Sequence, residues 1–120
     1  MPMRVTQFQI LAKNPERAAE FYQRVFGWRV HSDNALAYRT LDTGGIAGGI
    51  WPAPPEAPSM VQLFLEVADV SAAVATATEA GARVVIPPST LPEGDEMAVI
   101  LDPEGITFGL FSKAQPSGGV

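Results

Sequence analysis

The 120-residue sequence predicts an α+β fold made of two βαβββ modules. Segments in which apolar and polar residues alternate, as in strands, surround one helical segment in each half of the chain. The two halves also match each other at a separation of 55 residues, and the alternative, a four-stranded ferredoxin-like fold, needs half as many strands as the eight found. The matched pairs are Gln7 with Gln62, Ile10 with Leu65, Asn14 with Asp69 and Ala18 with Ala73.

The first half begins with an alternating strand over residues 5–11. Asn14 is a favourable N-cap and Pro15 a favourable first helical residue, so a helix follows and ends at Gly27. Its apolar stripe, predicted to pack on a sheet, is Ala18, Phe21, Tyr22, Val25 and Phe26. Turn residues then separate three more strands, over residues 28–32, 36–41 and 45–51.

The second half follows a proline-rich connector over residues 52–59, which favours an extended chain. A strand over residues 61–67 leads to a helix capped by Asp69 and ended by Gly81. Three strands follow, over residues 82–86, 97–101 and 106–111. Residues 113–120 are predicted to be a flexible tail.

The composition excludes several classes of function. A net charge of −5 and a pI near 4.7 argue against a nucleic-acid partner, which would call for a basic surface. The absence of cysteine excludes disulfides and thiolate chemistry. Neither a signal segment nor a membrane-spanning run is found, so a cytoplasmic protein without membrane partners is expected.

Five segments together resemble the vicinal oxygen chelate superfamily, which includes glyoxalase I, the bleomycin-resistance proteins and the extradiol dioxygenases. They are VTQFQI, NPERAAEFYQRVFGW, GGIAGGIW, LFLEVADVSAAV and DPEGITFGLF. The resemblance implies a single domain over residues 4–112, with modules at about 4–51 and 60–112. Its eight mostly antiparallel strands would form an open, incomplete barrel with the helices outside and a cavity between the modules.

Metal-dependent members of this superfamily take one ligand from the first and one from the last strand of each module. Transferred to this sequence, the first-strand positions are Gln7 and Gln62, and the last-strand positions are Gly49 and Gly109. Glycine offers no donor side chain, and two neutral amides replace poorly the charged or imidazole ligands that divalent cations prefer. We therefore expect no metal and no cofactor, with open space at the two glycines.

The residues predicted to line the cavity are amides and aromatic rings. Amides offer hydrogen-bond donors and acceptors without charge, and rings favour a flat or apolar ligand. Without a ligand, water or mutual hydrogen bonds, each buried amide would cost on the order of 1–3 kcal/mol. The predicted ligand-binding residues are Gln7, Gln9, Trp51, Gln62, Phe64 and Phe111.

Three functions remain open, led by a protein that binds a small molecule without a metal. The first alternative is a lyase, isomerase or dioxygenase-type enzyme that uses a displaced metal or metal-free acid–base chemistry. Its candidate groups are Glu66 and His31, although the favoured interpretations are a solvated carboxylate at a strand end and an exposed or edge histidine. The second is a dimeric module that binds other proteins. A homodimer is expected from the resemblance alone, and the sequence does not identify a ligand.

Overall fold

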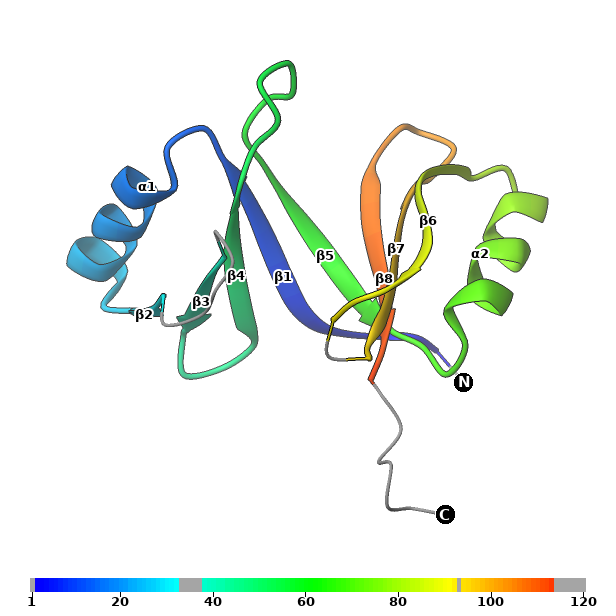
Figure 1. The fold of residues 1–120 in the computed structure, drawn as a ribbon, viewed down its shortest axis with the longest axis horizontal. Helices are drawn as coiled ribbons and strands as arrows, with labels where there is room; N and C mark the ends of the chain where they lie inside the picture. The colour runs from blue at the N-terminus through cyan, green and yellow to red at the C-terminus, as the bar shows by residue number, and fades with distance from the viewer. Residues whose placement is uncertain (1, 33–37, 93, 114–120) are drawn as a thin grey trace, which may run out of the picture. The chain divides into compact units, whose positions relative to one another are not determined.

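The structure is a computed structural model that describes residues 2–32, 38–92 and 94–113. Its elements confirm the α+β fold with paired βαβββ modules (Figure 1). The first module contains β1 (Arg4–Ala12), α1 (Pro15–Phe21), the π-helical η1 (Tyr22–Phe26), β2 (Arg29–His31), β3 (Arg39–Asp42) and β4 (Ala47–Pro52). The second contains β5 (Met60–Glu66), α2 (Val70–Glu79), β6 (Arg83–Thr90), β7 (Glu96–Leu101) and β8 (Thr107–Ser112).

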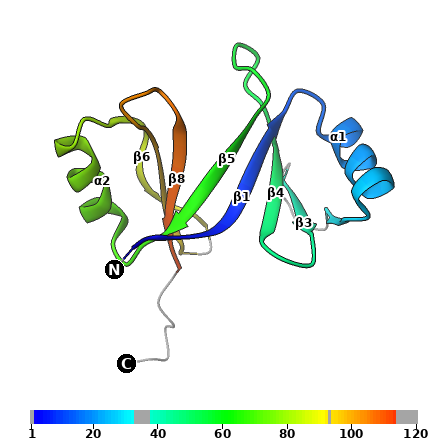
Figure 2. The same ribbon diagram turned by 180° about the vertical axis from the view of Figure 1, so that it is seen from behind.

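Each module arranges its four strands in the same way. The order is β2-β3-β4-β1 in the first module and β5-β8-β7-β6 in the second. In both, the first and last strands pair in parallel and the other neighbours pair antiparallel (Figure 2). The chain divides into two compact units, one of which is Thr6–Gln62, while the other takes the start of β1 and the chain from Leu63 onward.

One face of each sheet is covered by the module's own helix. In the first module Ile10, Leu41 and Ile50 are buried in a core that Tyr22 closes from the helical side. In the second, Val70 and Leu110 belong to the corresponding core. Because successive side chains of a strand alternate between faces, the residues between these core positions project away from the helix. That second face carries the residues of functional interest.

Both helices begin at the predicted caps. The side chains of Asn14 and Asp69 each accept a hydrogen bond from the backbone N–H three residues later, at 3.1 Å in both cases. Gly27 and Gly81 adopt positive φ angles of 73° and 105° just after the helical segments. The sequence therefore located the boundaries of both helices correctly.

The apolar stripe of the first helix is not buried as predicted. Residues 22–26 form a π-helix, in which each turn holds more residues than an α-helical turn. A stripe spaced for an α-helix is therefore rotated away from the sheet over its second half. Ala18 and Tyr22 pack on the core, whereas Phe21, Val25 and Phe26 are exposed.

Several strand boundaries also differ from the predicted ones. β6 runs to Thr90 and pairs with β7 through two register shifts, so part of the predicted loop before residue 97 is strand. The predicted strand over residues 36–41 is described only from residue 38, and β3 begins at Arg39. Most of the predicted tail, residues 114–120, lies outside the described residues. Within the described part of the chain no helix is long and apolar enough to cross a membrane.

Candidate functional site

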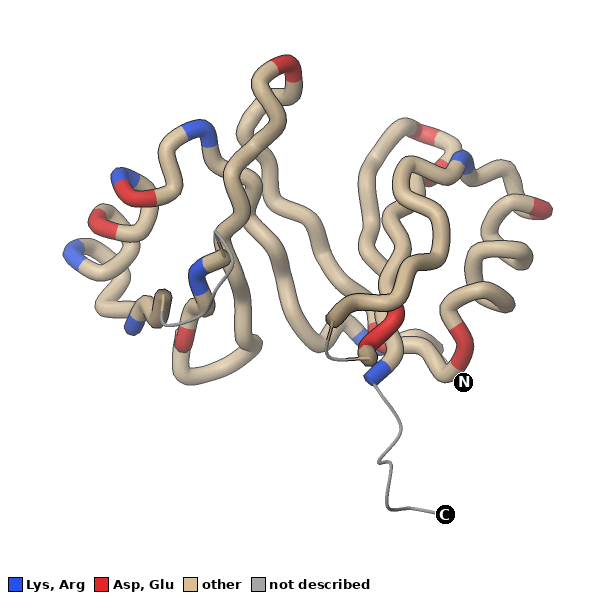
Figure 3. Tube along the Cα trace, viewed as in Figure 1, with Lys and Arg blue, Asp and Glu red and all other residues tan. Residues whose placement is uncertain are grey.

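The first module gathers polar and aromatic side chains on the sheet face opposite α1. Parallel pairing places Gln7 beside Ala47, Gln9 beside Gly49, and Leu11 beside Trp51. Gln9 is buried, whereas Gln7 and Trp51 are half-buried. No charged residue lies between positions 6 and 12 or between 47 and 52, and the traces of β1 and β4 are uncoloured there (Figure 3). This face therefore offers hydrogen bonds without charge.

Gly49 is not beside open space, so that prediction was wrong. A Cβ atom at this position would overlap the ring of Tyr38, which lies across the glycine. The Tyr38 hydroxyl accepts a hydrogen bond from Nε2 of Gln9 at 3.2 Å. The ring also packs on Trp51, with 4.6 Å between ring centroids and 34° between ring planes. Tyr38, Gln9 and Trp51 thus form one cluster around the glycine.

The second module fills its glycine position with a different ring. Phe64 on β5 pairs directly with Gly109 on β8, and a Cβ atom at Gly109 would overlap the Phe64 ring. Phe64 is 6% exposed and brings no polar atom. Two residues further along, Glu66 pairs with Phe111, which is half-buried. The expectation of open space fails here too, because the absent side chain is replaced by a neighbouring phenyl ring.

The superfamily's metal site does not fit the residues present. Its four positions hold Gln7, Gly49, Gln62 and Gly109, which together supply two amide oxygens and no carboxylate or imidazole. Among the described residues no three His, Cys, Asp or Glu side chains are grouped to hold a metal ion. Rings occupy the space where two further ligands would have to project.

The two candidate catalytic residues occupy ordinary surroundings. Glu66 lies at the end of β5, with a carboxylate oxygen 3.9 Å from a guanidinium nitrogen of Arg4. His31 is exposed at the end of the short strand β2. Gln62 is buried on β5, and its Nε2 lies 3.8 Å from the sulfur of Met60.

Sequence reasoning missed Tyr38. The signal was available in the antiparallel pairing of β3 with β4, which places Arg39 beside Ile50. Extending that register by one residue sets Tyr38 beside Trp51 and therefore on the face that carries Gly49. A search for the nearest bulky residue on the neighbouring strands would have found it.

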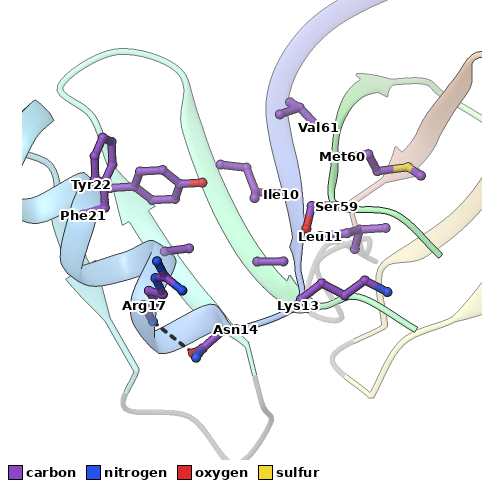
Figure 4. Close-up of a pocket in the computed structure, with 12 residues that line it drawn as sticks. Ile10, Leu11, Lys13, Asn14, Arg17, Phe21, Tyr22, Ser59, Met60 and Val61 are labelled. Carbon is purple, nitrogen blue, oxygen red and sulfur yellow. Dashed lines mark hydrogen bonds between the residues drawn. The ribbon is translucent and has the colours of Figure 1, made fainter. Parts of the chain in front are cut away.

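A groove of about 560 Å³ in the compact unit Thr6–Gln62 lies on the helical side of β1. Phe21 of α1 and Tyr22 of η1 border one side, and Met60 and Val61 at the start of β5 border the other (Figure 4). None of the six predicted ligand-binding residues lines it. Its full lining is Ile10, Leu11, Ala12, Lys13, Asn14, Arg17, Ala18, Phe21, Tyr22, Ser59, Met60 and Val61.

With this geometry in place, comparison with known proteins identifies the family. The model of the glyoxalase-like domain matches residues 7–111. The chain belongs to the glyoxalase-like domain family. The match spans both modules and confirms the vicinal oxygen chelate superfamily that the sequence segments indicated.

Two curated relatives, both named "Putative glyoxylase CFP32", come from Mycobacterium bovis and Mycobacterium tuberculosis. Each is 31% identical to this glyoxalase-like domain over 112 residues, covering 88% of the chain and 42% of the relative. The chain thus spans less than half the length of the curated relatives it matches.

Solved structures share the fold at low identity. A hypothetical protein from Bacillus halodurans aligns with a TM-score of 0.71 and 13% identity, over 95% of this chain and 96% of its own. Methylmalonyl-CoA epimerase from Mycobacterium tuberculosis aligns with a TM-score of 0.67 and 18% identity, over 95% of this chain and 90% of its own. The Streptomyces coelicolor methylmalonyl-CoA epimerase complexed with 2-nitronate-propionyl-CoA aligns with a TM-score of 0.63 and 18% identity, over 94% of this chain and 99% of its own.

Proposed function

We propose that this glyoxalase-like domain binds a small molecule without a metal ion. The observation that carries the proposal is the filling of both acidic ligand positions by rings, Tyr38 at Gly49 and Phe64 at Gly109. A carboxylate at either position would require the ring to leave. The amides that remain in the ligand set, Gln7 and Gln62, suit hydrogen bonding to an uncharged group better than binding a divalent cation.

The binding residues in this proposal are those that face away from the helices. Gln7, Gln9 and Trp51 supply two amides and an indole ring in the first module. Phe64 on β5 and Phe111 on β8 supply apolar surface in the second, and Gln62 lies two residues before Phe64 on β5. A ligand with a flat or apolar body and a few hydrogen-bonding groups matches these chemistries.

Native mass spectrometry of protein purified without chelator tests this function. We expect no stoichiometric divalent metal, and we expect co-purified small molecules or members of a compound library to raise the melting temperature. Stoichiometric metal that disappears in the variant carrying Gln7→Ala and Gln62→Ala would overturn the metal-free part of the proposal. A library that leaves the melting temperature unchanged would overturn small-molecule binding itself.

An acid–base enzyme is the second candidate function. Its support is Glu66, a partly buried carboxylate on a strand that also carries the buried Phe64. The relatives named "Putative glyoxylase CFP32" and the methylmalonyl-CoA epimerase of the same fold support this candidate by analogy. Turnover of a carbonyl or thioester substrate that falls at least tenfold in Glu66→Gln would establish it; equal turnover in both proteins would exclude Glu66.

We also propose that the chain forms a homodimer. Large apolar side chains are exposed along the helical segment of the first module and on β5, including Phe21, Phe26 and Val61. Such a surface is costly to leave in water and is typical of contact sites. Light scattering should give twice the chain mass at working concentration, and a monomer would refute the proposal.

A further inference from the structure

The amide of Gln9 is only half satisfied by the protein. The residue is 6% exposed, and its Nε2 donates to the hydroxyl of Tyr38 at 3.2 Å. Its Oε1 is buried and accepts no hydrogen bond from the described residues. A buried acceptor without a partner costs on the order of 1–3 kcal/mol. An explanation for this oxygen is therefore needed.

The fold itself does not require an amide at this position. Gln9 pairs with Gly49 in the first module as Phe64 pairs with Gly109 in the second. An apolar ring meets all packing requirements in the second module, where it fills the space over the glycine. A hydrophobic residue at position 9 would remove the unsatisfied oxygen without disturbing the strand pairing. The amide is thus better explained by recognition than by folding.

The surroundings of the free oxygen define what it could recognise. Tyr38 holds the nitrogen end of the amide, which leaves the oxygen end as a hydrogen-bond acceptor. The tilted pair of Tyr38 and Trp51 adds aromatic surface beside it. Both rings are half-buried, so each keeps solvent-accessible aromatic surface beside the shielded amide. No charged side chain belongs to the cluster.

We propose that Oε1 of Gln9 accepts a hydrogen bond from an N–H or O–H group of a flat, uncharged ligand that packs against Trp51. The proposal rests on the proposed function and narrows its ligand class to planar molecules that carry a donor, such as indoles and phenols. Acceptor-only molecules of the same shape would leave the oxygen unsatisfied and bind more weakly. Gln9 is therefore assigned as a specificity-determining residue.

Indole and benzofuran make a matched pair of probes, because they share a shape and differ by an N–H donor. We expect the wild-type protein to bind indole about tenfold more tightly than benzofuran in titrations followed by NMR, as one hydrogen bond allows. The resonances of the Gln9 side-chain amide should shift with indole. In Gln9→Leu the preference should fall to about onefold, while the melting temperature stays equal or rises because the unsatisfied oxygen is gone.

Thr6→Val is the control variant. Thr6 on β1 also buries an oxygen that has no hydrogen-bond partner among the described residues, but strand alternation places it on the opposite face from Gln9. It should keep the full preference for indole. Equal affinity for the two probes on the wild-type protein, or a preference that survives in Gln9→Leu, would overturn the assignment.

The probe comparison on the wild-type protein stands even if Gln9→Leu does not fold. Failure of indole to bind up to its solubility would also overturn the inference. Screening the compound library by melting temperature then distinguishes failure of the Gln9 assignment from failure of small-molecule binding as a whole. Ligands that bind without involving Gln9 leave the proposed function intact, whereas the absence of any ligand removes both.

Discussion

The two modules share a backbone plan and differ in the chemistry of one position. In each, a glycine on the last strand pairs in parallel with a buried residue on the first. That residue is Gln9 in the first module and Phe64 in the second, and the ring over the glycine comes from Tyr38 in one and from Phe64 itself in the other. The same gap is therefore filled by a hydrogen-bonded pair in the first module and by one apolar ring in the second.

This difference distinguishes a residue that serves packing alone from one whose polar group packing does not require. The second module closes its gap with a residue that needs only packing. The first module uses two residues, one of which retains an unused polar atom. Because both modules fold on the same plan, the fold does not require the additional polar groups of the first module.

The largest expected effect comes from removing the filling rings. Phe64→Ala should destabilise the protein by about 3–4 kcal/mol, because the ring is buried and leaves a cavity beside Gly109. Tyr38→Ala should cost about half as much, since the tyrosine is only half-buried. Urea unfolding of both variants measures the difference. Equal losses would show that the two rings contribute equally and would remove the contrast between the modules.

Adding a methyl group at the glycines should have the next largest effect. Gly109→Ala places a Cβ inside the position of the buried Phe64 ring and should cost about 2–3 kcal/mol. Gly49→Ala should cost about 1 kcal/mol, because Tyr38 can swing outward. Thermal or urea unfolding gives both values.

Gly45→Ala is the control for these glycine variants. Gly45 has no positive φ, and an added Cβ would meet only the Thr43 hydroxyl oxygen, at 3.9 Å. The stability of the Gly45→Ala variant should match that of the wild-type protein. In a Phe64→Ala background, Gly109→Ala should lose most of its cost, since the ring it clashes with is gone; an unchanged cost there would refute the steric explanation.

The sequence was sufficient to predict the module plan and the helix boundaries. Alternation, the caps at Asn14 and Asp69, and the glycines after the helical segments each depend on local physical chemistry, which a single chain displays. The exposure of Val25 and Phe26 could not be predicted, because it follows from a π-helical widening that changes the helical period without changing the residue pattern.

The candidate site was predicted only in part. Gln9 and Phe64 were placed on the correct face by strand alternation. The filling of Gly49 and Gly109 was missed, because a glycine in a strand indicates a close approach without naming the group that approaches. That group is a cross-strand neighbour in both modules, and it is fixed by register. For Tyr38 this is the register of the adjacent strands β3 and β4, and for Phe64 it is the parallel pairing of β5 with β8, which are distant in sequence.

A smaller effect is expected from making the first module chemically like the second. Tyr38→Phe removes the acceptor of Gln9 Nε2 and should cost about 1 kcal/mol, because both ends of the buried amide then lack partners. The double variant with Gln9→Leu should recover this loss, since an apolar pair needs no hydrogen bonds. A double variant less stable than Tyr38→Phe alone would show that Gln9 has a structural role this geometry does not reveal.

The smallest effect is expected from the two ion pairs. Arg39 and Glu16 of the first module approach to 3.6 Å. Arg4 at the start of β1 and Glu66 at the end of β5, which belong to the same compact unit, approach to 3.9 Å. One partner of each pair is largely exposed, since the Glu16 and Arg4 side chains are 86% and 78% accessible. Water and salt therefore screen both pairs, and double-mutant cycles should give couplings below about 0.5 kcal/mol.

The less exposed partner distinguishes the two pairs. It is the cation Arg39 in the first module and the anion Glu66 in the second. A coupling well above 1 kcal/mol for Arg4→Met with Glu66→Gln, persisting in high salt, would mean that Glu66 lies in a less polar environment than its exposure suggests. Such a result would favour the acid–base alternative, because a poorly solvated carboxylate is a stronger base. A weak, salt-sensitive coupling would indicate that Glu66 is a solvated residue at the strand end. It would favour the proposed ligand binding by the first module over acid–base catalysis by Glu66.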